Sequence, residues 1–129
     1  MFVVLVEKEL LKKLYDFLFS QKLTFEICFP NDGEDNCDNP LLYGKKEICN
    51  MDNIHIEEWD GMEGAIKVAG VLTDEVKQVF YKALSERGIW RYAFYRGGKQ
   101  IVEVYDFDDI ILRLQDDEVE KLREQGIVD

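Results

Sequence analysis

The sequence predicts an α+β fold of two layers, in which a mostly antiparallel sheet carries helices on one face. Apolar and polar residues alternate along 23–29, which is typical of a half-buried strand. Apolar residues recur at helical spacing in 7–20 and 74–87. Two strand-like segments flank Gly97-Gly98, as in a tight hairpin. Together these observations predict the element order β-α-β-β-β-α-β-β-α.

The first part of the chain predicts a strand, a helix and a second strand. The β-branched run at 2–6 predicts a buried strand, and the apolar stripe after it predicts a helix over about 7–20. The alternating segment 23–29 ends at Pro30, because proline has no backbone N–H to give to a sheet. Residues 30–40 are rich in Asp, Asn, Gly and Pro, so an acidic loop is expected there.

The middle of the chain predicts a hairpin. Segment 41–52 is ambiguous, and a short helix is one option for it. Residues 54–59 have the pattern of a strand, and Asp60-Gly61 after them is a signal for a two-residue turn. Residues 62–71 would then return as the partner strand.

The next segment predicts a capped helix and a second hairpin. Thr73 is a suitable N-cap for a helix over about 74–87, and Gly88 is a natural residue to follow its last turn. Segments 89–96 and 99–107 are expected to pair with each other.

The C-terminal segment leaves one choice open. Residues 110–114 fit either a short strand or the start of a helix. Asp116 is suited to cap a final helix over about 117–125, which Gly126 would end.

Composition favours a folded acidic protein. Residues 1–129 are expected to form a single compact domain, since 47% of them are apolar. The chain has 16 basic and 27 acidic residues, for a net charge of −11. Segment 30–63 has ten acids and two bases, and segment 103–129 has ten acids and three bases. Such a charge repels nucleic acid and anionic membranes and attracts basic partners.

The sequence also predicts a cytoplasmic location. The first residues lack the basic segment and small-residue cleavage site of a secretory signal. No apolar run approaches the roughly 18 residues of a membrane span. The three cysteines are irregularly spaced, which does not suggest a disulfide framework.

The hairpin around Gly97-Gly98 predicts an aromatic surface. If Arg96 pairs with Lys99, the smaller Ala93, Val102 and Val104 share a face that suits packing by a helix. The opposite face would then be mainly aromatic, with Trp90, Tyr92, Phe94, Ile101, Glu103 and Tyr105. This face is either buried inside the monomer, covered by a homodimer or another protein, or used as a stacking platform for a small ligand.

Catalytic and cofactor motifs are scarce. Asp106, Asp108 and Asp109 form a carboxylate cluster that is a candidate site for a divalent metal. Neither a dinucleotide-binding nor a P-loop glycine motif occurs, so no cofactor is expected.

We therefore expect a protein that acts by binding a basic partner protein. In the sharper form it is an inhibitor or immunity-type protein, whose carboxylates replace phosphates in the cleft of a nucleic-acid-handling partner. The candidate contacts are the carboxylates of the acidic middle segment: Asp32, Glu34, Asp35, Asp38, Glu57, Glu58, Asp60 and Glu63. The alternative is a small-ligand-binding domain or metal-dependent enzyme that uses the aromatic hairpin face and the aspartate cluster.

Overall fold

The computed structural model describes residues 2–5, 8–31, 39–107 and 109–128, and it shows an α+β fold. The strands are β1 (Phe2–Leu5), β2 (Thr24–Phe29), β3 (His55–Glu58), β4 (Ile66–Val71), β5 (Tyr92–Arg96), β6 (Lys99–Tyr105) and β7 (Asp109–Leu112). They form one antiparallel sheet in the order β1-β7-β6-β5-β2-β4-β3.

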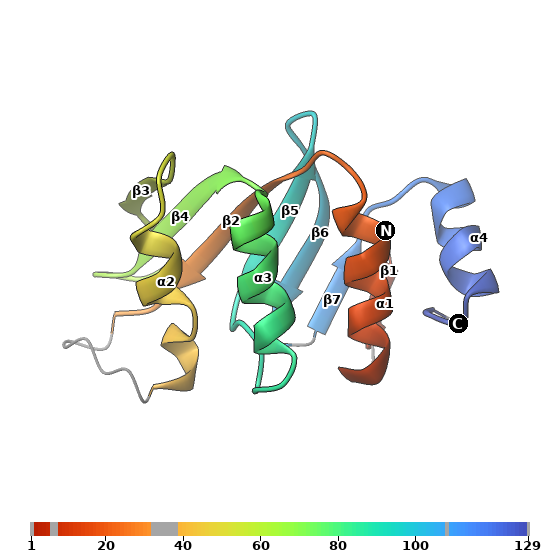
Figure 1. The fold of residues 1–129 in the computed structure, drawn as a ribbon, viewed down its shortest axis with the longest axis horizontal. Helices are drawn as coiled ribbons and strands as arrows, with labels where there is room; N and C mark the ends of the chain where they lie inside the picture. The colour runs from red at the N-terminus through yellow and green to blue at the C-terminus, as the bar shows by residue number, and fades with distance from the viewer. Residues whose placement is uncertain (1, 6–7, 32–38, 108, 129) are drawn as a thin grey trace.

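Helices cover one face of this sheet. They are α1 (Lys8–Phe19), α2 (Lys45–Cys49), α3 (Asp74–Ala83) and α4 (Asp116–Glu124), with a 3-10 turn, η1, at Pro40–Leu42. All four helices lie on the same side of the sheet (Figure 1), which confirms the predicted two-layer α+β architecture. We call the other side of the sheet the open face. In the described part of the chain, no helix is long and apolar enough to cross a membrane.

The structure resolves both segments that the sequence left open. The ambiguous segment 41–52 holds the end of η1 and the short helix α2. Segment 110–114 is mostly strand, and as β7 it joins the N-terminal strand β1 to the rest of the sheet.

The helix α3 begins as predicted and ends earlier. The Thr73 hydroxyl accepts a hydrogen bond from the backbone N–H of Val76 at 3.3 Å, which caps the first turn. The last α-helical residue of α3 is Ala83. The backbone N–H groups of residues 84–86 each donate to the carbonyl oxygen three residues earlier, rather than four residues earlier as in an α-helix. Gly88, at φ +105°, then turns the chain toward β5, as glycine does at little steric cost.

The core lies between the helices and the covered face. On the sheet side Phe25, Ile27 and Phe94 are at most 1% exposed. They meet apolar stripes of α1 and α3, including Leu14 and Phe80. Each large apolar side chain buried in this way contributes about 1.5–3 kcal/mol to folding.

A register shift in the second hairpin overturns the predicted aromatic face. Arg96 pairs with Lys99 as predicted, but a bulge follows, so that Phe94 pairs with Val102 and Tyr92 with Val104. The two aromatic rings therefore share the covered face with Val102 and Val104. Glu103, which the regular register would place in the core, lies on the open face instead.

The bulge has a physical cause. Without it, the Glu103 carboxylate would be buried among apolar side chains, which costs several kcal/mol for an unpaired charge. With it, Glu103 pairs with Arg113 at 3.0 Å and Val102 and Val104 are each 1% exposed. The extra residue, Ile101, is also buried.

The first hairpin exists, but its predicted two-residue turn is wrong. Glu58 pairs with Ile66, so the loop spans 59–65. The Trp59 ring packs over Gly61 so closely that a Cβ there would lie 2.5 Å from it. This packing, with a hydrogen bond from Trp59 N–H to the Ala65 carbonyl, replaces the tight turn.

Candidate protein-binding surface

A strongly acidic segment lies at one edge of the sheet. We call residues 51–63 the acidic edge; this segment contains β3, the last strand of the sheet. It has no lysine or arginine and five carboxylates, all exposed: Asp52, Glu57, Glu58, Asp60 and Glu63. Four of the predicted contact residues are therefore brought together.

Only part of this charge is neutralised. Glu57 lies 3.1 Å from the Lys67 ammonium and 3.4 Å from His55, and hydrogen bonds to both lower the pKa of its carboxyl. Within the described chain, Glu58, Asp60 and Glu63 make no ion pair. The edge thus presents an excess of negative charge to solvent.

Apolar side chains are exposed among these carboxylates. Ile56 is 46% exposed and Met62 is 39% exposed. In the part of the chain that the structure describes, Val71 is the one other large apolar side chain that is exposed. Apolar groups ringed by charges are the usual composition of a protein interface, where the centre is apolar and the rim polar.

Trp59 fixes the acidic loop to the sheet. The Arg91 guanidinium lies 4.9 Å from the Trp59 ring and 4.2 Å from the Tyr105 ring, and we call these three residues the arginine stack. Trp90 meets Trp59 edge to face, with ring centroids 6.3 Å apart. Because the loop is held by packed rings, its carboxylates are positioned before any partner arrives.

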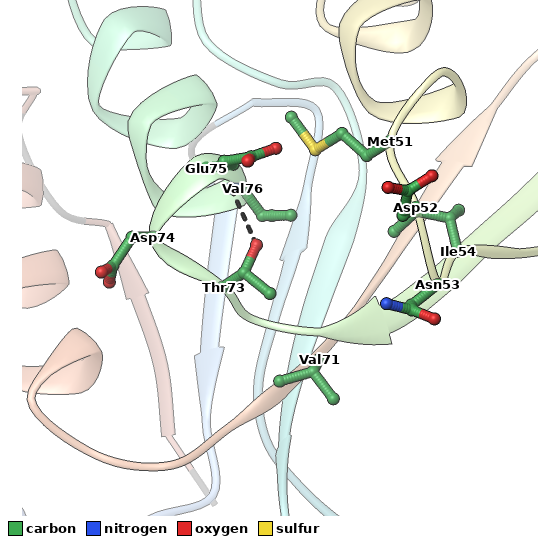
Figure 2. Close-up of a pocket in the computed structure, with 9 residues that line it drawn as sticks. All are labelled: Met51, Asp52, Asn53, Ile54, Val71, Thr73, Asp74, Glu75 and Val76. Carbon is green, nitrogen blue, oxygen red and sulfur yellow. Dashed lines mark hydrogen bonds between the residues drawn. The ribbon is translucent and has the colours of Figure 1, made fainter.

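A groove adjoins the other end of β3 (Figure 2). Its volume is about 390 Å³, and it separates the segment before β3 from the start of α3. The lining includes apolar side chains, among them Met51, Ile54 and Val76, and the carboxylates of Asp52 and Glu75. The Asp74 carboxylate points away from these residues and lies 3.7 Å from the Lys77 ammonium.

Glycine at position 70 allows the groove to form. A Cβ there would lie 3.1 Å from Ile54 Cδ1 and 3.2 Å from the Asn53 carbonyl oxygen. The segment before β3 therefore passes close against β4. The chemistry of the groove, apolar walls with carboxylates at its margin, suits a side chain with an aliphatic stem and a cationic end.

The predicted contacts Asp32, Glu34, Asp35 and Asp38 lie outside the described residues.

The four aromatic residues of the predicted hairpin face are divided between two environments. Tyr92 and Phe94 are 2% and 0% exposed beneath the helices, so the chain itself covers them. Trp90 and Tyr105 are half-buried, and Tyr105 belongs to the arginine stack on the open face. The prediction of one shared aromatic face is wrong because of the bulge in β6.

The predicted aspartate cluster lies at the β6–β7 turn. Asp106 is exposed at φ +48°, Asp109 is half-buried in β7, and Asp108 lies outside the described residues. Among the residues with described positions, no three His, Cys, Asp or Glu side chains group as metal ligands. Burial raises the pKa of the Cys28 thiol to about 11, so this thiol stays protonated at neutral pH.

Sequence reasoning missed four residues of this surface: Asp52, Trp59, Glu75 and Arg91. Asp52 was within the acidic segment and could have been included from its charge alone. Trp59 meets Arg91 only through the β3–β4 loop, and Glu75 reaches the surface at the groove, beside Asp52; no local pattern specifies either placement.

No family model, curated protein or solved structure matches this chain. Its function is therefore inferred from the surface itself.

Proposed function

We propose that the protein is a non-catalytic binding protein that captures a basic partner protein through its acidic edge. The observation that carries the proposal is the composition of residues 51–63: five exposed carboxylates, no basic residue, and two exposed apolar side chains among them. The charges attract and orient a basic partner, and the apolar groups supply contact area once it is bound.

The groove supports the same function. A lysine or arginine side chain of the partner fits with its aliphatic stem against Met51, Ile54 and Val76. Its cationic end then meets Asp52 and Glu75. Charge-assisted hydrogen bonds of this kind are about twice as strong as neutral ones.

The sharper form of the proposal concerns inhibition. A row of carboxylates resembles a row of phosphates in charge, so the edge is suited to occupy the basic cleft of a nucleic-acid-handling protein. Such a complex would form quickly at low salt and more slowly at high salt, because steering acts over roughly a Debye length of 10 Å at 0.1 M salt.

A defined cationic probe tests the binding surface. We expect hexa-arginine amide, titrated into the ¹⁵N-labelled protein at low salt, to shift the backbone amide signals of residues 51–63 and 73–76. The helix α4 is an internal control, because it also has five carboxylates but intersperses them with Lys121 and Arg123. Shifts that are as large on α4 as on the edge would contradict the proposal.

A further inference from the structure

The open face differs in charge from the rest of the molecule. Strands β2 to β7 and the residues that flank them place four carboxylates and three cations on it, a net charge of −1 in a chain of −11. The carboxylates belong to Glu26, Glu57, Glu103 and Asp109, and the cations to Lys67, Arg91 and Arg113. The strong negative charge of the protein therefore lies almost entirely elsewhere.

Two of the four carboxylates on this face pair with cations of the same chain. Glu57 lies 3.1 Å from Lys67, and Glu103 lies 3.0 Å from Arg113. Arg91 lies between the Trp59 and Tyr105 rings. Removing a charged side chain from water costs less free energy when it already has an oppositely charged partner, because the attraction between the two offsets part of the desolvation penalty.

The face also has apolar and aromatic side chains. Val71 is 62% exposed, and Tyr95, Tyr105 and Ile111 are half-buried. Trp, Tyr and Arg, the three members of the arginine stack, are the residue types that dominate binding energy at protein interfaces.

The shape of the face favours a broad contact over a small ligand. The recess over Ala93, between Glu26 and Glu103, has a volume of about 60 Å³. Pockets for small molecules are usually about 300–1,000 Å³. The sheet has seven strands, which are about 4.8 Å apart and about 17 Å long, so its projected area is roughly 600 Å². In a standard interface each partner contributes roughly 800 Å² of accessible surface, which is an area of the same order.

We propose that the open face binds a second copy of this chain, so that two sheets pack face to face in a symmetric dimer. Two copies that each have a charge of −11 repel one another, and the repulsion is weakest where the contact face is nearly neutral. A basic partner is drawn instead to the acidic edge. The dimer leaves the helix layer outside. It shares Glu57 and Trp59 with the acidic edge, but it does not depend on the function proposed for that edge.

Molar mass in solution tests this proposal. By sedimentation equilibrium at about 100 μM, we expect twice the chain mass of 15.2 kDa. Val71→Glu combined with Ile111→Glu adds two negative charges to the open face and is expected to give a monomer. Val71→Glu alone, at a side chain already exposed to solvent, is expected to weaken the dimer at least tenfold without affecting the fold.

A matched control adds the same charge elsewhere. Gln78→Glu combined with Gln125→Glu places two carboxylates at exposed positions on α3 and directly after α4, and this variant is expected to remain a dimer. Circular dichroism confirms folding in each case. A wild-type monomer at this concentration, or a dimer that survives both open-face variants, would overturn the proposal. Because only self-association is measured, failure here would leave the role of the acidic edge standing.

Discussion

The hydroxyls of Tyr15 and Tyr92 bond to each other inside a core that is otherwise apolar. The two side chains are 3% and 2% exposed, and burial raises the pKa of Tyr15 well above its ordinary value. Each hydroxyl offsets part of the cost of burying the other. The pair also joins α1 to β5, two elements that lie 77 residues apart in the sequence.

Removing one member of this pair is expected to cost more than removing both. In Tyr92→Phe the Tyr15 hydroxyl loses its partner, so the free energy of unfolding should fall by about 1–3 kcal/mol. Tyr15→Phe combined with Tyr92→Phe leaves neither hydroxyl, and its stability should lie closer to that of the wild type. Urea unfolding of the variants measures the difference. A double variant that loses the sum of the two single losses would refute the pairing.

At the scale of elements, α4 is attached to the second hairpin by one ion pair. The Arg96 guanidinium donates two hydrogen bonds of 2.8 Å to the Glu118 carboxylate and one of 2.6 Å to Gln21. The bond from Arg96 is the main reason that the pKa of Glu118 lies below its ordinary value of 4.5. Glu118 also closes the capping box of α4 by accepting from the Gln115 N–H.

This attachment predicts a pH-dependent stability. A carboxyl whose pKa is lowered in the folded state stabilises the fold above its unfolded pKa, and the contribution is lost as the pH falls through the folded pKa. Glu118→Gln keeps the capping box but removes the charge. It should lower the free energy of unfolding by about 1 kcal/mol at pH 7, and by progressively less below pH 4.5. Thermal unfolding at several pH values measures this cost. Glu120→Gln, at an exposed ion pair with Arg123, is the control and should change little. A Glu118→Gln cost that does not vary with pH would disprove the role of the charge.

The elements also show what sequence patterns can and cannot predict. The three longer helices and the pairing of Arg96 with Lys99 depend on neighbouring residues, and the sequence predicts them apart from two details. The helix α3 ends earlier than predicted, and the N-cap of α4 is Gln115, whereas Asp116, the predicted cap, is its first helical residue. The short helix α2 was only one option for an ambiguous segment. The bulge in β6 depends on which face of a distant sheet is covered, so it could be inferred only by noticing that regular pairing buries Glu103. The predicted Asp60-Gly61 turn is wrong because Trp59 packs against Arg91 and Trp90, which lie just before β5 and far from the loop in the sequence.

The candidate site was predicted less completely than the fold. The concentration of charge in 30–63 was visible in the composition, and four of the eight predicted carboxylates are exposed in the acidic edge. The groove was not visible, because its walls come from segments about 20 residues apart that the pairing of β3 with β4 brings side by side.

The two proposed binding surfaces of the molecule differ in net charge, although Glu57 belongs to both. The acidic edge has five carboxylates without a basic residue, while the open face has a net charge of −1. In the two proposals, the negative charge attracts a basic partner to the acidic edge, and self-association takes place on the face whose net charge is only −1.

The measurement that tests the central claim most directly is a comparative capture experiment in lysate of the organism that encodes the protein. The tagged wild type is compared with an edge variant that combines Asp52→Asn, Glu58→Gln, Asp60→Asn and Glu63→Gln. A control variant neutralises four exposed carboxylates on helices and combines Glu9→Gln, Asp117→Asn, Glu120→Gln and Glu124→Gln. Each is tested at about 0.05 and 0.5 M salt, where the Debye length falls from well over 10 Å to only a few ångströms.

We predict one basic protein, identified by mass spectrometry, that the wild type and the control variant retain at low salt. The edge variant and the high-salt wash should both lose it. Retention of the same protein by the edge variant, or equal loss from the control variant, would contradict the claim that the acidic edge is the binding surface.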